Sequence, residues 1–181
     1  FGGQAIAEAL FGDYNPGGRL AVTFPKSVGQ IPFAFPFKPG SDESSETSVY
    51  GALYPFGHGL SYTTFQYSDL VISPSKQGVQ GNISISCTIK NIGQREGDEV
   101  VQLYLRDEVS SVTTYTQVLR GFERITLKPE ASHTVHFELT PQELGIWDKQ
   151  MNFTVEPGMF KVMIGSSSKD IRLKGEFEIA Q

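Results

Sequence analysis

Acidic residues are the first candidates for chemistry in this sequence, because positioned carboxylates can act as acids, bases or nucleophiles. Asp42, Glu43 and Glu46 lie together in the polar run Ser41–Ser48. Hydrolysis of a glycosidic bond needs two carboxylates held about 5–9 Å apart. Nothing in this run fixes such a separation, and we interpret the three acids as part of a solvated loop.

Two further acidic pairs are adjacent in the sequence, Asp98-Glu99 and Asp107-Glu108. Both occur where apolar and polar residues alternate, as they do in a β-strand. Successive side chains of a strand point to opposite faces of the sheet. We therefore expect that neither pair acts as a catalytic pair.

The histidines and the single cysteine give no clear metal or nucleophilic site. His133 and His136 lie on or beside the polar phase of a predicted strand and are expected to face solvent. His58 lies among aromatic residues, where a packing role is favoured over a metal-binding or catalytic role. Cys87 lies on the apolar phase of its strand, which predicts a buried and inert thiol. One cysteine also excludes an internal disulfide and a cysteine-based zinc site.

Two common catalytic or binding motifs are incomplete or missing. Gly57-x-Gly59 lacks the third glycine and the following helix of a phosphate-binding loop. No Gly-x-Ser-x-Gly sequence is present to carry a serine nucleophile. We assign no catalytic, cofactor-binding or metal-ligating residue to this chain, and we predict no cofactor.

Composition and charge narrow the class of protein. The chain has 181 residues, of which 39% are hydrophobic, and a net charge of −5. The negative charge and the lack of a basic stripe argue against a nucleic-acid partner. No run of about 18 apolar residues is present to span a membrane. The chain begins with Phe1 rather than Met, and we expect it to continue a longer protein.

The N-terminal segment has the pattern of a helix followed by a strand. Gln4–Phe11 predicts a short helix with Gly12 at its left-handed C-cap position. The alternation over residues 19–24 predicts a strand that Pro25 ends. One helix and one strand cannot bury their apolar faces against each other alone. We therefore interpret residues 1–28 as the C-terminal end of an α/β domain.

Residues 29–60 are predicted to form a linker and a junction. Their first half contains apolar residues that are expected to wrap against the fold: Ile31, Phe33, Phe35 and Phe37. The stretch 53–67 is rich in aromatic residues, and we expect four of them to be largely buried: Tyr54, Phe56, Tyr62 and Phe65. Gly57 and Gly59 are expected to let the backbone pass close to them.

Residues 61–181 show the two-residue periodicity of β-strands. The clearest example is Ile83, Ile85, Cys87 and Ile89, which alternate with polar residues. About seven such short strands, joined by turn residues, predict a sandwich of two sheets. Pro141–Leu144 predicts one helical turn. The Cys…Trp…Cys spacing of antibody domains is absent, which favours a fibronectin type III-like sandwich. The fold class is therefore mainly β, an immunoglobulin-like sandwich preceded by a helix-strand remnant.

Two segments of this sequence resemble glycoside hydrolase family 3, the β-glucosidase and β-xylosidase family. Residues 3–25, GQAIAEALFGDYNPGGRLAVTFP, resemble the closing segment of that family's α/β sandwich domain. Residues 54–65, YPFGHGLSYTTF, are similar to its junction into a C-terminal fibronectin type III-like domain. Four segments of the sandwich are also similar to that domain: VVQLYLRD (100–107), LRGFER (119–124), LTP (139–141) and VEPG (155–158).

The resemblance implies a retaining glycosidase that cleaves terminal β-linked sugars with two carboxylates about 5 Å apart. Its nucleophile is an aspartate of an N-terminal (β/α)-barrel domain, and its acid/base lies upstream of the helix predicted at Gln4–Phe11. Glu8 lies in that helix and does not match the acid/base motif. This chain would then give structural support, be inactive alone, and have the missing barrel and α/β portions as its partners. The resemblance also implies a secreted or periplasmic protein.

A module that binds sugar or mediates adhesion by itself is the alternative. Such a module would need an exposed platform of aromatic residues. It would have no use for the helix and strand predicted in residues 1–25. This segment therefore favours the enzyme over the module.

Overall fold

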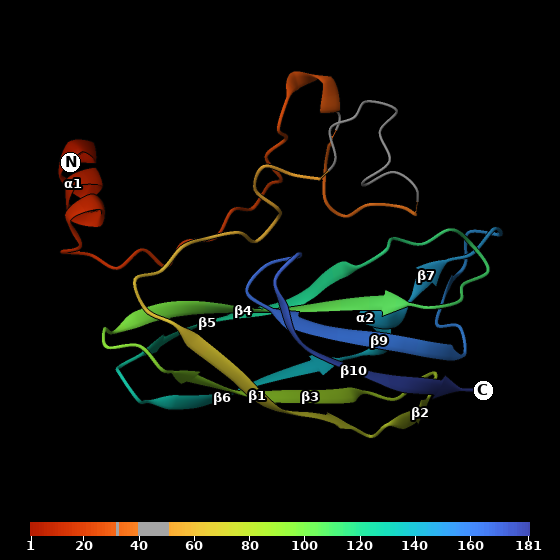
Figure 1. The fold of residues 1–181 in the computed structure, drawn as a ribbon. Helices are drawn as coiled ribbons and strands as arrows, with labels where there is room; N and C mark the ends of the chain where they lie inside the picture. Colours follow the sequence, from red (N-terminus) through yellow and green to blue (C-terminus); the bar gives the residue numbers. More distant parts are fainter. Residues whose placement is uncertain (32, 40–50) are drawn as a thin grey trace.

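Two β-sheets pack face to face in the computed structural model, which describes residues 1–31, 33–39 and 51–181 (Figure 1). One sheet has the strand order β1-β3-β6, and the other has the order β2-β10-β9-β4-β5. Neighbouring strands are antiparallel, except that β2 runs parallel to β10. The three-stranded sheet comprises β1 (Phe65–Ser73), β3 (Ile83–Asn91) and β6 (Ser132–Leu139). The five-stranded sheet comprises β2 (Lys76–Gly78), β4 (Gly97–Asp107), β5 (Val118–Leu127), β9 (Gly158–Gly165) and β10 (Ile171–Ala180).

The short elements lie around this sandwich. α2 (Pro141–Leu144) forms the predicted helical turn, and the Thr140 side chain caps its N-terminus. It leads into the small hairpin of β7 (Ile146–Trp147) and β8 (Phe153–Thr154). α1 (Gly2–Phe11) lies apart from the sheets, and η1 (Val28–Gln30) lies in the linker above the five-stranded sheet (Figure 1). No helix in the described ranges is long and apolar enough to cross a membrane.

The core lies between the two sheets and has the residues that the periodicity predicts. In β3 the alternate residues Ile83, Ile85, Cys87 and Ile89 are fully buried. They face the inward side chains of β4 and β9, and the rings of Phe160 and Phe177 stack 5.4 Å apart at the other side of the core. The fibronectin type III-like sandwich and the burial of Cys87 are therefore confirmed.

Strand β4 is buried on both faces over residues 101–105. Val101, Leu103 and Leu105 point into the core, whereas Gln102 and Tyr104 point outward and are 3% and 0% exposed. The linker covers them, because the ring of Phe35 packs edge-on against Tyr104 with the centroids 5.7 Å apart. The outer face of this strand is therefore part of a second contact, between the linker and the sandwich.

The N-terminal segment confirms one prediction and corrects another. α1 ends at Gly12, which has the expected left-handed conformation with φ 84°. Residues 19–24 form no continuous strand, because their backbone meets the junction at two separate places. Leu20 forms backbone hydrogen bonds with His58 and Gly57. Phe24 forms backbone hydrogen bonds with Leu53 and Tyr54. Among the described residues no strand lies along the intervening part of the segment.

Two expectations about the linker have different outcomes. Phe35 and Phe37 are half-buried and pack edge-on with their centroids 6.1 Å apart. Ile31 is 67% exposed, so the expectation that it packs against the fold is wrong. It follows η1, whose capping box of Ser27 and Gln30 holds the turn by polar contacts instead. The acids Asp42, Glu43 and Glu46 lie outside the described residues.

Candidate functional site at the junction

Residues 12–24 and 53–67 meet the start of β4 in a cluster of buried polar groups, which we call the junction site. Five backbone hydrogen bonds join the two segments, and the longest runs from Tyr54 N to Phe24 O at 3.3 Å. Leu20 N donates to His58 O at 2.9 Å, and Gly57 N donates to Leu20 O at 2.8 Å. Phe24 N donates to Tyr54 O at 2.9 Å, and Leu53 N donates to Phe24 O at 2.8 Å. The N-terminal segment is therefore attached to the junction before any side chain contributes.

A buried ion pair attaches this segment to the sandwich. Nη2 of Arg19 donates to Oε2 of Glu99 at 2.9 Å, and the two side chains are 9% and 4% exposed. The hydroxyl of Tyr67 donates to the other carboxylate oxygen at 2.8 Å. The guanidinium of Arg172 lies over the Tyr67 ring, 5.9 Å from its centroid. Glu99 thus links the N-terminal segment, β1 and β4 through one carboxylate.

Burial sets the titration of this group. Desolvation raises the pKa of Glu99, while Arg19 and the Tyr67 hydrogen bond act in the opposite direction. Burial also raises the pKa of the Tyr67 hydroxyl, and the neighbouring Glu99 charge adds to that increase. The hydroxyl therefore stays a hydrogen-bond donor at neutral pH. A buried carboxylate of this kind needs its partners, because an isolated ion is costly to bury.

Gly57 and Gly59 allow close contacts, as the sequence predicts. Gly57 has φ 81°, and a Cβ atom there would lie 2.1 Å from Oε1 of Gln102. Gln102 itself donates to the carbonyl oxygens of Gly57 and Ser166, and it accepts from the Tyr104 hydroxyl. A Cβ atom at Gly59 would lie 2.3 Å from the carbonyl oxygen of Gly18. Glycine is required here for lack of space on both sides of the junction.

A second polar contact holds the turn before Arg19 against the sandwich. Asn15 donates to the carbonyl oxygen of Glu96 at 3.0 Å and accepts from the backbone N–H of Tyr62 at 2.7 Å. The hydroxyl of Tyr62 donates to the carbonyl oxygen of Ala9 at 2.7 Å. The guanidinium of Arg95 lies over the Tyr62 ring. These contacts position the end of α1 beside the sandwich.

The aromatic residues of the junction are only partly buried, and this corrects the prediction for two of them. Phe65 is 6% exposed, as expected, and Phe56 is half-buried and stacks on Phe35 with centroids 4.6 Å apart. Tyr54 and Tyr62 are 44% and 48% exposed. The reason is that both rings face the N-terminal segment rather than the sandwich core. Tyr54 packs against His58 and Phe24, and Tyr62 bonds Ala9.

The remaining candidates for chemistry are dispersed. His133 and His136 are exposed, and His58 stacks on Tyr54 with the ring centroids 5.1 Å apart. Burial raises the pKa of the Cys87 thiol to about 11, which makes it a poor nucleophile. No group of three or more His, Cys, Asp or Glu side chains that could hold a metal ion occurs within the described residues.

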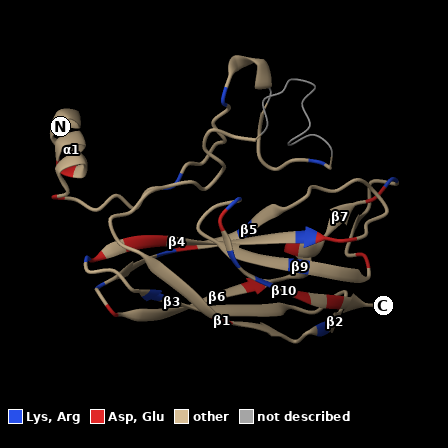
Figure 2. Ribbon diagram, viewed as in Figure 1, with Lys and Arg blue, Asp and Glu red and all other residues tan. Residues whose placement is uncertain are grey.

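The adjacent acids lie apart, as the strand geometry predicts. Asp98 faces outward and pairs with Arg124, whereas Glu99 is buried with Arg19, and both lie at the start of β4. Figure 2 shows acidic residues in red on the part of β4 nearer to α1. Asp107 accepts from Val109 N at 3.2 Å, and Glu108 pairs with Lys161 at 2.7 Å. Neither pair converges on a shared position, so neither provides a catalytic couple.

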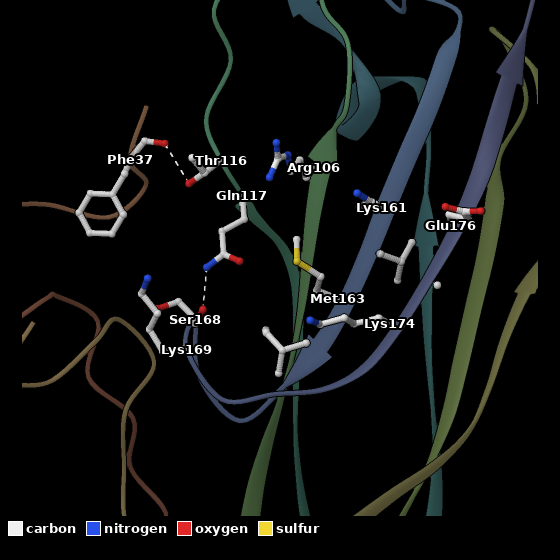
Figure 3. A pocket seen from close by; sticks show the side chains of 13 residues that line it. Phe37, Arg106, Thr116, Gln117, Lys161, Met163, Ser168, Lys169, Lys174 and Glu176 are labelled. Atoms are coloured by element: carbon white, nitrogen blue, oxygen red, sulfur yellow. Dashed lines mark hydrogen bonds between the residues drawn. The ribbon is translucent and has the colours of Figure 1, made fainter. Parts of the chain in front are cut away.

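A broad hollow of about 980 Å³ lies on the outer face of the five-stranded sheet, beside the linker (Figure 3). Thr116 N donates to Phe37 O at 2.8 Å, and Gln117 Nε2 donates to Ser168 O at 2.7 Å along its edge. Its charged side chains are Arg106, Lys161, Lys169, Lys174 and Glu176. With a single carboxylate among these residues, the hollow does not provide the pair that glycoside hydrolysis requires.

The junction residues also match a known family of domains. The family model described as the glycosyl hydrolase family 3 C-terminal domain matches residues 1–62, and the fibronectin type III-like domain matches residues 99–168. The chain belongs to the C-terminal region of glycosyl hydrolase family 3. It is 44% identical to a periplasmic beta-glucosidase of Salmonella typhimurium over 98% of its length, and 43% identical to a beta-xylosidase of Formosa agariphila over 95%.

Solved structures of this family have the same fold. A β-glucosidase from Erythrobacter marinus matches 99% of the chain with a TM-score of 0.92 and 39% identity. A β-glucosidase from Listeria innocua in complex with glucose matches 99% with a TM-score of 0.88 and 32% identity. The family 3 chain spans about a quarter of each relative, 25% and 24% of the two enzymes and 24% and 26% of the two structures.

Sequence reasoning missed the two buried polar residues that hold the junction, Glu99 and Gln102. A signal for Glu99 was present, because it shares the inward phase of β4 with Val101 and Leu103. A carboxylate at a core position requires a buried partner. No comparable signal identified Gln102, since the outward face of a strand ordinarily meets water.

Proposed function

We propose that this chain is the C-terminal part of a family 3 β-glycosidase that removes terminal β-linked glucose or xylose by a retaining mechanism. The observation that carries the proposal is the pattern of coverage. Enzymes named β-glucosidase and β-xylosidase match 95–98% of this chain at 43–44% identity, while the chain spans only about a quarter of them. The family match over residues 1–62 supports the same conclusion.

In this proposal the chain supports the enzyme and does not supply its catalytic carboxylates. Residues 1–28 close the α/β sandwich domain, residues 29–60 are the linker and junction, and residues 61–181 form the fibronectin type III-like domain. α1 supports this division, because Ile6, Leu10 and Phe11 are 62%, 72% and 84% exposed and need a covering surface. The barrel and the rest of the α/β domain would provide that surface and hold the substrate.

The junction site gives the chain its role within such an enzyme. The Arg19–Glu99 pair and the backbone bonds of Leu20 and Phe24 connect the end of one domain to the start of the next. A fixed connection keeps the two domains in one relative position. The relative named a periplasmic beta-glucosidase supports placing the enzyme in the periplasm or outside the cell.

The test compares the full-length protein with the 181-residue chain. Nitrophenyl β-glucoside and β-xyloside are the substrates, and nitrophenyl α-glucoside is the control. We expect the full-length protein to hydrolyse at least one β-glycoside and the 181-residue chain to hydrolyse none above a mock preparation. Turnover by the short chain would contradict the supporting role, and a full-length protein inactive on both β-glycosides would contradict the proposed activity.

A further inference from the structure

A smaller hollow of about 250 Å³ lies at the other end of β4 from the junction site. It is bordered by the end of β4, the start of β5, α2 and β7. Asp107 lies eight residues after Glu99 in β4, which is about 26 Å along a strand at about 3.3 Å per residue. The hollow is therefore remote from the place where the N-terminal segment meets the sandwich.

The polar groups of this hollow have unused capacity for hydrogen bonds. The Nε atom of Arg120 is buried and has no hydrogen-bond partner in the described part of the chain. Arg120 lies near Glu143, whose Oε2 accepts from the backbone and side chain of Thr140. Within the described ranges Asp107 accepts one hydrogen bond, from Val109 N to Oδ1. A buried donor without a partner is uncommon in folded proteins and indicates a missing ligand or water.

Aromatic side chains border the same hollow. Tyr115 and Trp147 line it and are 42% and 59% exposed. The Trp147 ring packs edge-on against Phe153, with the centroids 5.5 Å apart and the planes at 61°. Trp147 and Phe153 also line a neighbouring hollow of about 790 Å³. An exposed tryptophan between two hollows offers an apolar face to a ligand.

Charge and size limit the class of ligand. One guanidinium and two carboxylates give the hollow a net negative charge, so an anionic ligand is disfavoured. The described residues contain no cluster of metal ligands here. Ligand sites usually have about 300–1,000 Å³, and this smaller volume suits a single ring. A neutral pyranose has hydroxyl groups for Arg120 and the carboxylates, and an apolar face of C–H groups for Trp147.

We propose that this hollow binds one neutral pyranose unit of a glycan, at a place remote from the junction site. The geometry supplies both kinds of contact that a sugar ring needs, polar groups from Asp107 and Arg120 and an aromatic face from Trp147. The choice of β-linked glucose or xylose as the ring rests on the proposed function. Sugar binding itself rests only on the hollow.

The test uses the 181-residue chain and NMR titration with cellotriose and with xylotriose, each up to about 20 mM. The sequence has one tryptophan, so a single indole N–H resonance reports on Trp147. We expect a saturable shift of that resonance with at least one of the sugars. Neutral sugar should shift it more than glucuronic acid or inorganic phosphate does. An equal or larger shift with either anion would overturn the proposal, as would no saturable shift with either trisaccharide.

Variants identify the site. Trp147→Ala and Arg120→Met should each weaken binding at least tenfold. Because Trp147→Ala removes the indole probe, binding to that variant is measured from the backbone amide resonances of residues 105–107. Phe122→Ala, an aromatic residue 67% exposed on β5, and Arg106→Met are the matched controls and should leave binding within twofold. Unchanged amide resonances of β3 show that each variant is folded. A variant of Arg120 or Trp147 that binds as the unmodified chain does would overturn the proposal.

The outcome is separable from that of the proposed function. Binding is measured on a chain that is expected to hydrolyse nothing, and hydrolysis is measured on the full-length protein. Sugar binding with an inactive full-length protein would refute the proposed activity and leave this site standing. An active full-length protein whose 181-residue part binds no sugar would refute this site and leave the proposed activity standing. In the full-length protein, a Trp147 indole that sugar no longer shifts would mean that another segment occupies the hollow, and would also overturn the proposal.

Discussion

Arg19→Met tests whether the buried ion pair holds the junction site together. The guanidinium lies 2.9 Å from the Glu99 carboxylate, and both side chains are almost completely buried. Met keeps most of the aliphatic length of Arg19 and removes its charge. The substitution leaves Glu99 with the Tyr67 hydroxyl as its remaining side-chain donor in the part of the chain that the structure describes.

The size of the effect follows from the burial of both partners. Removing one partner of a buried ion pair costs about 3–5 kcal/mol, because the other charge stays desolvated. The N-terminal segment is able to move away and admit water to Glu99, so we expect the lower end, about 3 kcal/mol. At about 1.4 kcal/mol for each factor of ten, this is more than a hundredfold in the opening equilibrium.

Native-state amide hydrogen exchange measures that equilibrium, whether the opening is local or global. The probes are the amides of Leu20 and Gly57, which donate across the junction at 2.9 and 2.8 Å. We expect their protection to fall about a hundredfold in Arg19→Met. The matched control is Arg106→Met, whose pair with Glu108 is exposed and contributes about 1 kcal/mol or less. Junction amides that stay protected within about threefold in Arg19→Met would refute the reasoning.

The same variant has a pH dependence with a defined sign. Burial raises the pKa of Glu99 in the folded chain, and Arg19 opposes this increase. Without Arg19 the folded pKa rises further above the unfolded value of about 4.3. A group whose folded pKa is raised stabilises the fold at low pH and loses that contribution as pH rises through the folded pKa. The loss of stability caused by Arg19→Met should therefore be smaller at pH 4 than at pH 7.

Three further predictions concern the junction, the smaller hollow that Asp107 lines, and the sandwich. Gly57→Ala should lower the free energy of unfolding by about 3 kcal/mol in urea denaturation, because of the positive φ and the clash with Gln102. Gly51→Ala, with φ 70° but no atom of the described residues within 4 Å of an added Cβ, should lower it by about 1 kcal/mol. Asp107→Asn should raise the free energy of unfolding by about 1 kcal/mol at pH 7 and leave it unchanged at pH 4. The reason is that burial raises the pKa of half-exposed Asp107 to about 6, so its ionisation destabilises the fold as pH rises through that value. An equal gain at both pH values would exclude titration as the cause. We expect residues 65–181 to fold alone. In the whole chain, amide hydrogen exchange should therefore be slow at Ile83–Ile89 and fast at Gln4–Leu10. Equal protection of the two segments would show that α1 has a partner.

The sandwich could be predicted from the sequence because the alternation of apolar and polar residues within each strand shows which side chains face the core. In β3, Ile83, Ile85, Cys87 and Ile89 meet the opposite sheet every second residue, so the period-two pattern alone gives their burial. The pattern at residues 19–24 has the same period and gives no strand. Alternation shows which side chains share a face, but a strand also needs a continuous neighbour for its backbone.

The exposure of the junction aromatics could not be predicted for a related reason. Tyr54 and Tyr62 have the size and polarity of core residues, yet each packs on a segment at least 30 residues away in the chain. Which segment covers a side chain depends on contacts distant in sequence. Local composition contains no information about those contacts. The burial of Gln102 beneath the linker was hidden for the same reason.

The chemistry of the junction site explains why it is built from polar groups. The backbone hydrogen bonds at Leu20 and at Phe24 do not depend on side-chain identity, so by themselves they would allow the segment to slip by two residues. The Arg19–Glu99 pair removes that freedom, because a slip would leave a carboxylate buried in the inward phase of β4 without its cation. Buried ion pairs add little net stability over apolar contacts, but one register satisfies them. We infer that Glu99 lies at a core position to fix the register between the N-terminal segment and the sandwich, and that stability comes from the apolar residues around it.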